Sequence, residues 1–314
     1  MYQIDIPTAA SSQPASTSEG TPGYFTDGNP TTGAAATILP AEFVNAIMLE
    51  LLNAITASGQ TPVKNQFTQL ANAIPPGMVG QAIRVSAELA AAGTSVTFTA
   101  DSIAVGTALG TPARTLANFN ETLNVATQGA GGMDTGSAPD SGYVAIYAIC
   151  DPTSGAVALL GTAASQTTVY GGSNLPSGYT LSALLAVWPT NGSGQLIAGT
   201  QCNRKFLYFV PSSVISGGTA TSATELSLAA AVPACAREIL GKFSGQETGS
   251  ISSLSAANFG PTSGSAGLIE VSAGVAEILY LDYLWVPLVA PQTFYYQSGK
   301  TTVLCSLAVC GFEI

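Results

Sequence analysis

The sequence predicts a mainly β protein, in which a short N-terminal arm and a small helical module precede an antiparallel, β-sandwich-like body. Apolar residues make up 46% of the 314 residues and charged residues only 8%. A core is therefore available, while the polar surface must come from uncharged side chains. Helical spacing of apolar residues is concentrated in residues 40–76. From Val79 onward, short apolar runs alternate with turn signals, the pattern of strands and tight turns.

The composition argues against several classes of function. The net charge is −10, and the eight basic residues cluster only at Arg204-Lys205. A nucleic-acid backbone needs several converging Lys and Arg side chains, so we expect no nucleic-acid partner. The chain contains no run of about 18 apolar residues, the length that would predict a membrane span. Its first residues lack the features of a signal peptide. Five cysteines without a CxxC motif suit folding in a reducing cytoplasm.

Residues 1–35 are expected to form an extended arm. They are rich in Ser, Thr, Pro and Gly, with turn signals at Asp27-Gly28 and Asn29-Pro30 and no helical period. A free arm of this composition would have little order of its own. We therefore expect it to lie against another protein.

Two short helices are predicted within residues 36–76. Pro40 and Glu42 suit a helix start, and two apolar stripes follow with steps of four, three and four residues. The first stripe consists of Val44, Met48, Leu51 and Ile55, and the second of Val63, Phe67, Leu70 and Ile74. Helices of this length cannot form a stable unit alone. Packing of copies around a symmetry axis would bury both stripes.

The β body divides in this interpretation into a domain over residues 79–210 and a distal domain over 211–314. Runs such as YVAIYAIC and ALLAVWP are apolar on both faces, which implies burial on both sides. The longest predicted loop covers residues 244–267. Loops of that length are more often functional than idle.

No catalytic constellation is apparent, so we expect no enzyme activity and no cofactor. The chain has no histidine, which excludes Ser-His-Asp and Cys-His arrangements and makes a zinc site improbable. It also lacks a GxSxG elbow and a P-loop. Its acidic residues are scattered, and no pair is favoured as the two carboxylates of a glycosidase.

The N-terminal residues resemble the N-terminal module of tail fibre proteins of bacterial viruses. That module pairs an aromatic-x-DGNP-x-TG turn with a helix that contains NAI-x-E-x-x-N-x-I, and then a QL-x-x-AI helix. The matching residues are Phe25, Asp27, Gly28, Asn29, Pro30, Gly33, Asn45, Glu50, Asn53, Ile55, Gln69, Leu70 and Ile74.

A second resemblance, to a β-domain common in such fibres, covers residues 129–206. GAGGMDTGS, YVAIYAIC, LPSGYT and TNGSGQLIAG follow in the same order as in those fibres, and CSLAVCGFEI is similar to their closing strands. The chain departs from the pattern at Met133, where Leu is usual, and at Gly142-Tyr143, where Trp-Tyr is usual. Residues 211–270 lie largely outside the resemblance.

The resemblance implies a homotrimeric structural protein of the virion tail, assembled in the host cytoplasm. Its N-terminus would dock on a tail or baseplate protein, and its distal β region would contact a host surface polysaccharide or outer-membrane receptor. Two alternatives remain open: an adaptor fibre without its own receptor site, and a fibre with polysaccharide depolymerase activity.

Three groups of candidate site residues follow from this interpretation. Virion attachment is assigned to Tyr24, Phe25, Asp27 and Asn29. The trimer helix core is assigned to Val44, Met48, Leu51, Ile55, Phe67, Leu70 and Ile74. Receptor contact is assigned to Phe259, Tyr170 and Tyr179.

Overall fold

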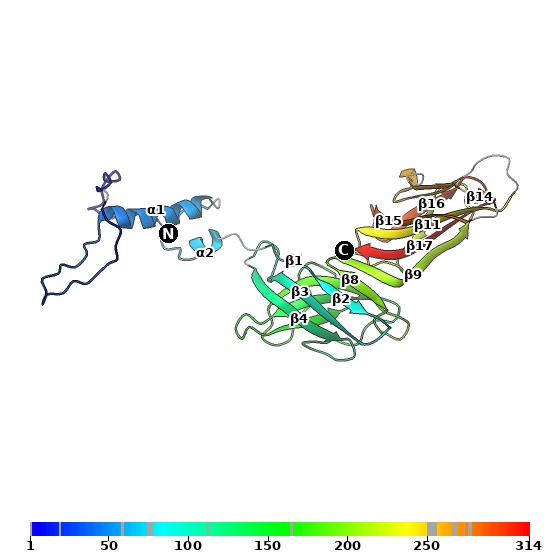
Figure 1. Ribbon diagram of the computed structural model, residues 1–314, viewed down its shortest axis with the longest axis horizontal. Helices are drawn as coiled ribbons and strands as arrows, with labels where there is room; N and C mark the ends of the chain where they lie inside the picture. The colour runs from blue at the N-terminus through cyan, green and yellow to red at the C-terminus, as the bar shows by residue number, and fades with distance from the viewer. Residues whose placement is uncertain are drawn as a thin grey trace. The chain divides into compact units, whose positions relative to one another are not determined.

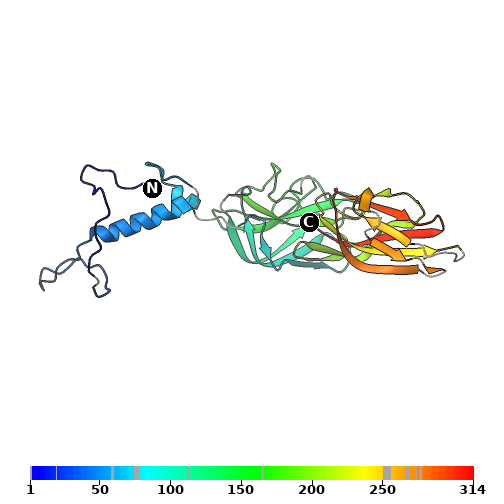
Figure 2. The same ribbon diagram turned by 90° about the horizontal axis from the view of Figure 1, so that it is seen from above.

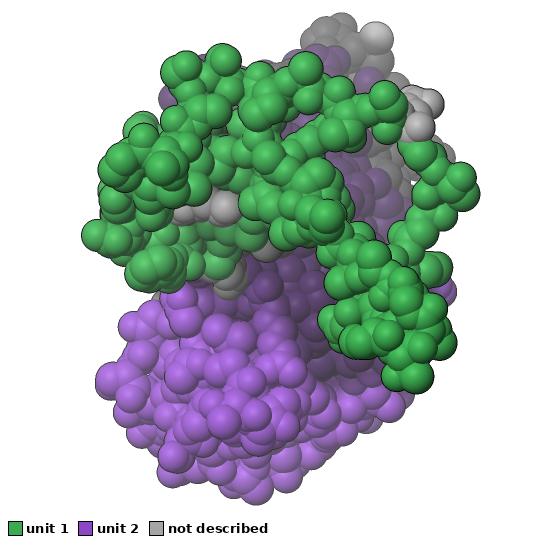
Figure 3. Space-filling view, turned by 90° about the vertical axis from the view of Figure 1, so that its left-hand side faces the viewer, with its two compact units in different colours: residues 1–76 green, residues 77–314 purple. Residues whose placement is uncertain are grey.

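The computed structural model describes residues 2–18, 20–57, 60–73, 78–111, 113–163, 166–249, 256–265, 269–272, 274–275 and 278–314. Figures 1 and 2 show the chain from two sides. It falls into two compact units, residues 1–76 and residues 77–314, coloured green and purple in Figure 3. Unit 1 holds both α-helices and unit 2 holds the named strands. The prediction of a mainly β protein is confirmed.

In unit 1, the first predicted helix is present and the second is shorter than expected. Helix α1 covers Ala41–Ala57, whereas α2 covers only Gln69–Ala73. The chain before α2 is held as a loop by the buried side chain of Gln69. Its Oε1 accepts a hydrogen bond from the Val63 amide (2.9 Å), and its Nε2 donates to the carbonyl of Thr61 (2.8 Å). Those backbone groups are thus satisfied by a side chain instead of by a helix.

Unit 2 contains three sheets. The largest has the strand order β1-β3-β2-β8-β9-β17-β11-β14, with β4 beside β3 and β15 beside β11 (Figure 1). These strands are β1 (Ala82–Ile83), β2 (Ser86–Leu89), β3 (Ser95–Val105), β4 (Arg114–Asn124), β8 (Gly199–Cys202), β9 (Lys205–Gly218), β11 (Glu238–Glu247), β14 (Gly274–Val275), β15 (Ile278–Pro287) and β17 (Val303–Glu313). All described pairings in this sheet are antiparallel except that of β11 with β14.

Two smaller sheets, both antiparallel, complete unit 2. One has the order β6-β5-β7 and the other the order β10-β16-β12-β13. Their strands are β5 (Tyr143–Cys150), β6 (Val157–Thr162), β7 (Leu181–Pro189), β10 (Thr224–Ser227), β12 (Ala256–Gly260), β13 (Ile269–Ser272) and β16 (Thr293–Ser298); a short 3-10 helix covers Ser263–Ser265.

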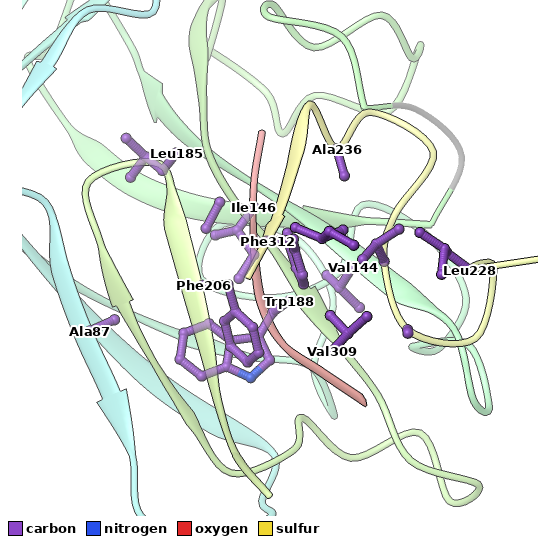
Figure 4. Close-up of a cluster of buried hydrophobic side chains, with 14 of the residues drawn as sticks. Ala87, Val144, Ile146, Leu185, Trp188, Phe206, Leu228, Ala236, Val309 and Phe312 are labelled. Atoms are coloured by element: carbon purple, nitrogen blue, oxygen red, sulfur yellow. The ribbon is translucent and has the colours of Figure 1, made fainter. Parts of the chain in front are cut away.

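The small sheets pack on the large sheet through buried aromatic side chains. Phe98 of β3 meets Trp188 of β7 with ring centroids 5.8 Å apart. Phe243 of β11 meets Phe259 of β12 at 5.0 Å and Phe294 of β16 at 6.1 Å. Figure 4 shows the region where side chains of β5, β7, β9 and β17 meet around Trp188. Strands β5 and β7 are buried along nearly their whole length, in agreement with their two-sided apolar sequence.

Two details of the expected organisation differ in the structure. The boundary placed between residues 210 and 211 falls inside β9, which pairs with β8 and with the last strand, β17. A single sheet therefore runs through both predicted β-domains. The stretch 244–267 is not one long loop, because its described part includes the end of β11 and all of β12.

Candidate functional site: the N-terminal interaction surface

Unit 1 exposes most of its large apolar side chains. Among its described residues, Ile55 is the single buried hydrophobic side chain. The exposed ones are Tyr2, Ile4, Ile6, Tyr24, Phe25, Ile38, Leu39, Phe43, Val44, Ile47, Val63, Phe67 and Leu70. In Figure 3 the loops of unit 1 stand apart with gaps between them. Exposed apolar surface on this scale indicates an interaction site.

The DGNPTTG segment forms a closed hairpin within this unit. Asn29 and Ala34 exchange backbone hydrogen bonds (2.9 and 3.1 Å), and the Thr37 amide donates to the Thr26 carbonyl (2.9 Å). Gly28 and Gly33 lie at φ of 76° and 74°, a region that favours glycine. The turn signals are confirmed, whereas the expectation of an arm without local structure is wrong for residues 26–37.

The four residues assigned to virion attachment lie on or beside this hairpin, and all are exposed. Tyr24 is 100% exposed. Phe25 contacts Phe43 of α1 edge to face, with ring centroids 5.2 Å apart. This contact links the hairpin to the first turn of the helix, so the two elements present one surface.

The arm that precedes the hairpin is held to the helical module at two points. The Thr17 amide and hydroxyl donate to Oε2 of Glu42 at 2.7 and 2.8 Å, and these bonds lower the pKa of the Glu42 carboxyl. The Lys64 ammonium donates to both carboxylate oxygens of Asp5, at 2.7 and 2.9 Å, which raises the pKa of Lys64. A cavity of about 340 Å³ lies between the arm and the α1 face that carries Asn45 and Met48.

The residues assigned to the trimer core occupy three kinds of environment. Ile55 is buried, and Met48 and Leu51 are half-buried. Val44, Phe67 and Leu70 are exposed, Phe67 to 92%. Ile74 lies outside the described residues. Part of the predicted stripe is thus covered within the chain, and the remainder is open to a partner.

The residues assigned to receptor contact lie mostly inside unit 2. Phe259 is fully buried against Phe243, and Tyr170 is 7% exposed. The Tyr170 hydroxyl donates to Oδ2 of Asp134 at 2.7 Å; burial, and then this bond, raise the pKa of Tyr170 to about 12. Tyr179 is half-buried. The burial of Phe259 and Tyr170 argues against a role in contacting a receptor, because neither ring is open to solvent.

No other chemical centre stands out in the described residues. Those residues contain no group of three or more Cys, Asp or Glu side chains placed to hold a metal ion. Of the helices that the structure describes, none has the length and hydropathy needed to cross a membrane. The sequence interpretation missed Ile38, Leu39 and Phe43 as exposed apolar residues of unit 1. Their position near the DGNPTTG turn, which carries the resemblance, could have indicated that they belong to the same surface.

The comparisons with known proteins give little further guidance. A scan against protein-family models finds no match, and a search of curated proteins finds no similar sequence. A search of solved structures finds the functional form of the mosquito-larvicidal Cry4Aa toxin from Bacillus thuringiensis, with a TM-score of 0.19 and 9% identity. The match covers 77% of this chain and 54% of the toxin chain. A similarity this low carries no argument about fold or function.

Proposed function

We propose that the protein is a tail fibre of a bacterial virus, which unit 1 anchors to the tail or baseplate and unit 2 extends toward the host cell surface. One observation carries the proposal. Unit 1 combines an ordered, exposed hairpin with an apolar helix, yet its described residues bury only one hydrophobic side chain. A segment of this size without its own core depends on partners for stability.

The difference between the two units in buried apolar surface fits this division of roles. Unit 2 has an extensive core and can support itself, as the distal part of a fibre must. The tail partner would cover the hairpin and Tyr24. Copies of the chain would cover the open part of the α1 stripe at Val44, together with the exposed Ile47 beside it, by packing around a threefold axis. The surface of few charges and many Ser, Thr and Asn residues suits a protein that works outside the cell.

The anchoring role is tested in the bacterial virus that carries the chain. Deletion of residues 2–35 should leave a folded, soluble protein that is missing from purified particles. Quantitative mass spectrometry of the particles measures its copy number. Normal copy number of the truncated chain would show that the hairpin is not the anchor.

The host-facing role is tested with the purified full chain. A fluorescent full-length protein should adsorb to a subset of bacterial strains and should compete there with the virus. The labelled deletion variant should adsorb equally well, since unit 2 is intact. Failure of the full chain to adsorb to any strain that the virus infects would refute this role.

A further inference from the structure

At Asp101, the pairing of β3 with its neighbouring strands is interrupted on both sides. On one side β1 pairs with Ile103 and Ser102, and β2 resumes the pairing at Thr99, so that the ladder is interrupted at Arg84 and Val85. On the other side β4 pairs with Ser102 and Ala100 but not with Asp101 itself. The register is unchanged across both interruptions. Arg84, Asp101 and Asn118 therefore lie in one row across β3 and its two neighbours.

Left-handed backbone is concentrated at this place. Seven non-glycine residues of the described chain have positive φ, and three of them, Arg84 (56°), Asn118 (52°) and Asn203 (53°), line one cavity. Asparagine tolerates this conformation, but arginine rarely adopts it. Unfavourable backbone of this kind clusters at binding sites, where the surrounding structure holds it in place.

At Asn203, hydrogen bonds hold this backbone in place. Asn203 lies in the two-residue turn between β8 and β9. Its amide donates to the Val85 carbonyl at 2.8 Å, and its Oδ1 accepts from the Val85 amide at 3.1 Å. Gln201 Nε2 donates to the Asn203 carbonyl at 2.7 Å, and Arg204 donates to the Gly80 carbonyl at 3.0 Å. Hydrogen bonds thus fix the Asn203 side of the cavity.

The row itself has unused hydrogen-bonding capacity. The cavity is open to solvent and has a volume of about 460 Å³. Arg84 Nη1 lies 3.3 Å from Oδ2 of Asp101, and both side chains are more than half exposed. The carboxamide of Asn118 makes no hydrogen bond to any other residue that the structure describes. Hydroxyls of Ser86 and Thr99 also line the cavity, and that of Thr99 donates to the Ser86 carbonyl at 3.5 Å.

The chemistry of the lining selects a class of ligand. A single carboxylate is a poor divalent-cation site, and the same carboxylate repels phosphate and other anions. A flat aromatic ligand would find no exposed ring, because the one aromatic residue at the cavity, Phe119, is buried. A guanidinium, a carboxylate, carboxamides and hydroxyls together offer donors and acceptors with no net charge. Adjacent hydroxyls of a ligand can donate to Asp101 and accept from Arg84 and Asn118.

We propose that this cavity binds a neutral sugar residue. The proposal rests on the proposed function only for the origin of the sugar, which would be the polysaccharide of a host surface. Binding of the sugar itself follows from the row of Arg84, Asp101 and Asn118, and the same chemistry would accept a free monosaccharide.

The test uses the full chain on an array of immobilised neutral and acidic glycans. Saturation-transfer NMR then measures the best neutral monosaccharide free in solution. Asn118→Gly removes the carboxamide but keeps a backbone that glycine adopts freely. Asp101→Asn removes the charge at constant shape. Each variant should weaken binding about tenfold or more, since a hydrogen bond of the complex, in Asp101→Asn a charged one, is lost or weakened. The matched control Thr115→Ala, on an exposed position of β4 outside the cavity, should bind like the natural chain.

The outcomes separate this inference from the proposed function. Absence of neutral-sugar binding, binding confined to acidic glycans, or binding that neither variant alters would overturn the inference. Adsorption to bacteria without sugar binding would leave the fibre role intact and reject this site. Sugar binding without adsorption to any strain would support this site and reject the host-facing role of the fibre. Thermal melts check folding, and Asp101→Asn keeps the test valid if Asn118→Gly does not fold.

Discussion

At the scale of single residues, Gly28 fixes the path of the N-terminal hairpin. A Cβ at this position would lie 2.6 Å from the Ala36 nitrogen and 2.7 Å from the Ala34 oxygen, whereas a Cβ at Gly33 would have nothing within 4 Å. Both glycines have similar positive φ. They therefore share the conformational cost of an alanine but differ in the clash with backbone.

The substitution Gly28→Ala should open the hairpin, and Gly33→Ala should leave it closed. Both carry the left-handed penalty of roughly 1–2 kcal/mol, so the difference between them isolates the clash. Hydrogen exchange of the Thr37 amide, which bonds to Thr26 in the hairpin, measures the result. Equal protection of this amide in both variants would show that the backbone around Gly28 accommodates a methyl group.

Inside unit 2, the single residue Phe259 should contribute strongly to stability. Its ring is fully buried between the large sheet and the β10-β16-β12-β13 sheet. Phe259→Ala should lower the free energy of unfolding by about 3–5 kcal/mol, because it removes a buried ring and leaves a cavity. Phe209→Ala, at an exposed ring of β9, should change it by no more than about 0.5 kcal/mol. Guanidinium denaturation measures both, and a small effect at Phe259 would contradict the burial.

At the scale of elements, α1 and the arm depend on each other through the start of the helix. Glu42 lies in the first turn, where the helix dipole stabilises a carboxylate. Thr17 donates two hydrogen bonds to this carboxylate. The bonds stabilise the ionised carboxylate, which is why its pKa is lowered. The protonated carboxyl accepts these bonds less well, so acid should loosen the arm.

The attachment of the arm should therefore depend on pH with a defined sign. Because the folded-state pKa of Glu42 is below the ordinary value of 4.5, its contribution is present above that value and is lost as the pH falls through the lowered one. The amide resonance of Thr17, followed by NMR from pH 6 downward, should shift with this titration. Glu42→Gln should abolish the shift, and a Thr17 titration that persists in this variant would assign it to another group.

At the scale of the whole molecule, the two units differ in how much of their apolar surface they bury. Unit 2 encloses an extensive core that joins its sheets, while unit 1 leaves most of its large hydrophobic side chains in solvent. The expected consequence is association of copies through unit 1, with the stripe of α1 at the contact.

Leu51 lies on the same helix face as the exposed Val44 and is only half-buried within the chain. Leu51→Asp should therefore convert the proposed trimer into monomers, because it would place three carboxylates near one apolar axis. Ala46→Asp is the matched control: it adds the same charge to an exposed position of the same helix, about 140° around its axis. Multi-angle light scattering measures the mass of each variant, and circular dichroism checks that the helix persists. A natural chain that stays monomeric at micromolar concentration would refute the trimer.

Much of the local structure was determined by the sequence alone. Apolar spacing of four, three and four residues predicted α1, since that period is the period of a helix. Asn29-Pro30 and the glycines predicted the turn of the hairpin, because few other residues adopt its backbone. Two-sided apolar runs predicted the buried strands β5 and β7. Each of these features depends on residues that are close together in the chain.

Only the tertiary structure decided which distant residues share an environment. Phe259 is buried because two sheets from separate parts of the chain close over it. Tyr170 is buried because its loop packs on Tyr147 of β5. Their own sequences do not encode these contacts. The loop before α2 replaces a predicted helix because Gln69 reaches back to Thr61 and Val63. The cavity beside Arg84 and Asp101 requires Asn203 to bond Val85, 118 residues away. Such pairings depend on strand order and register, which arise from the packing of the whole unit.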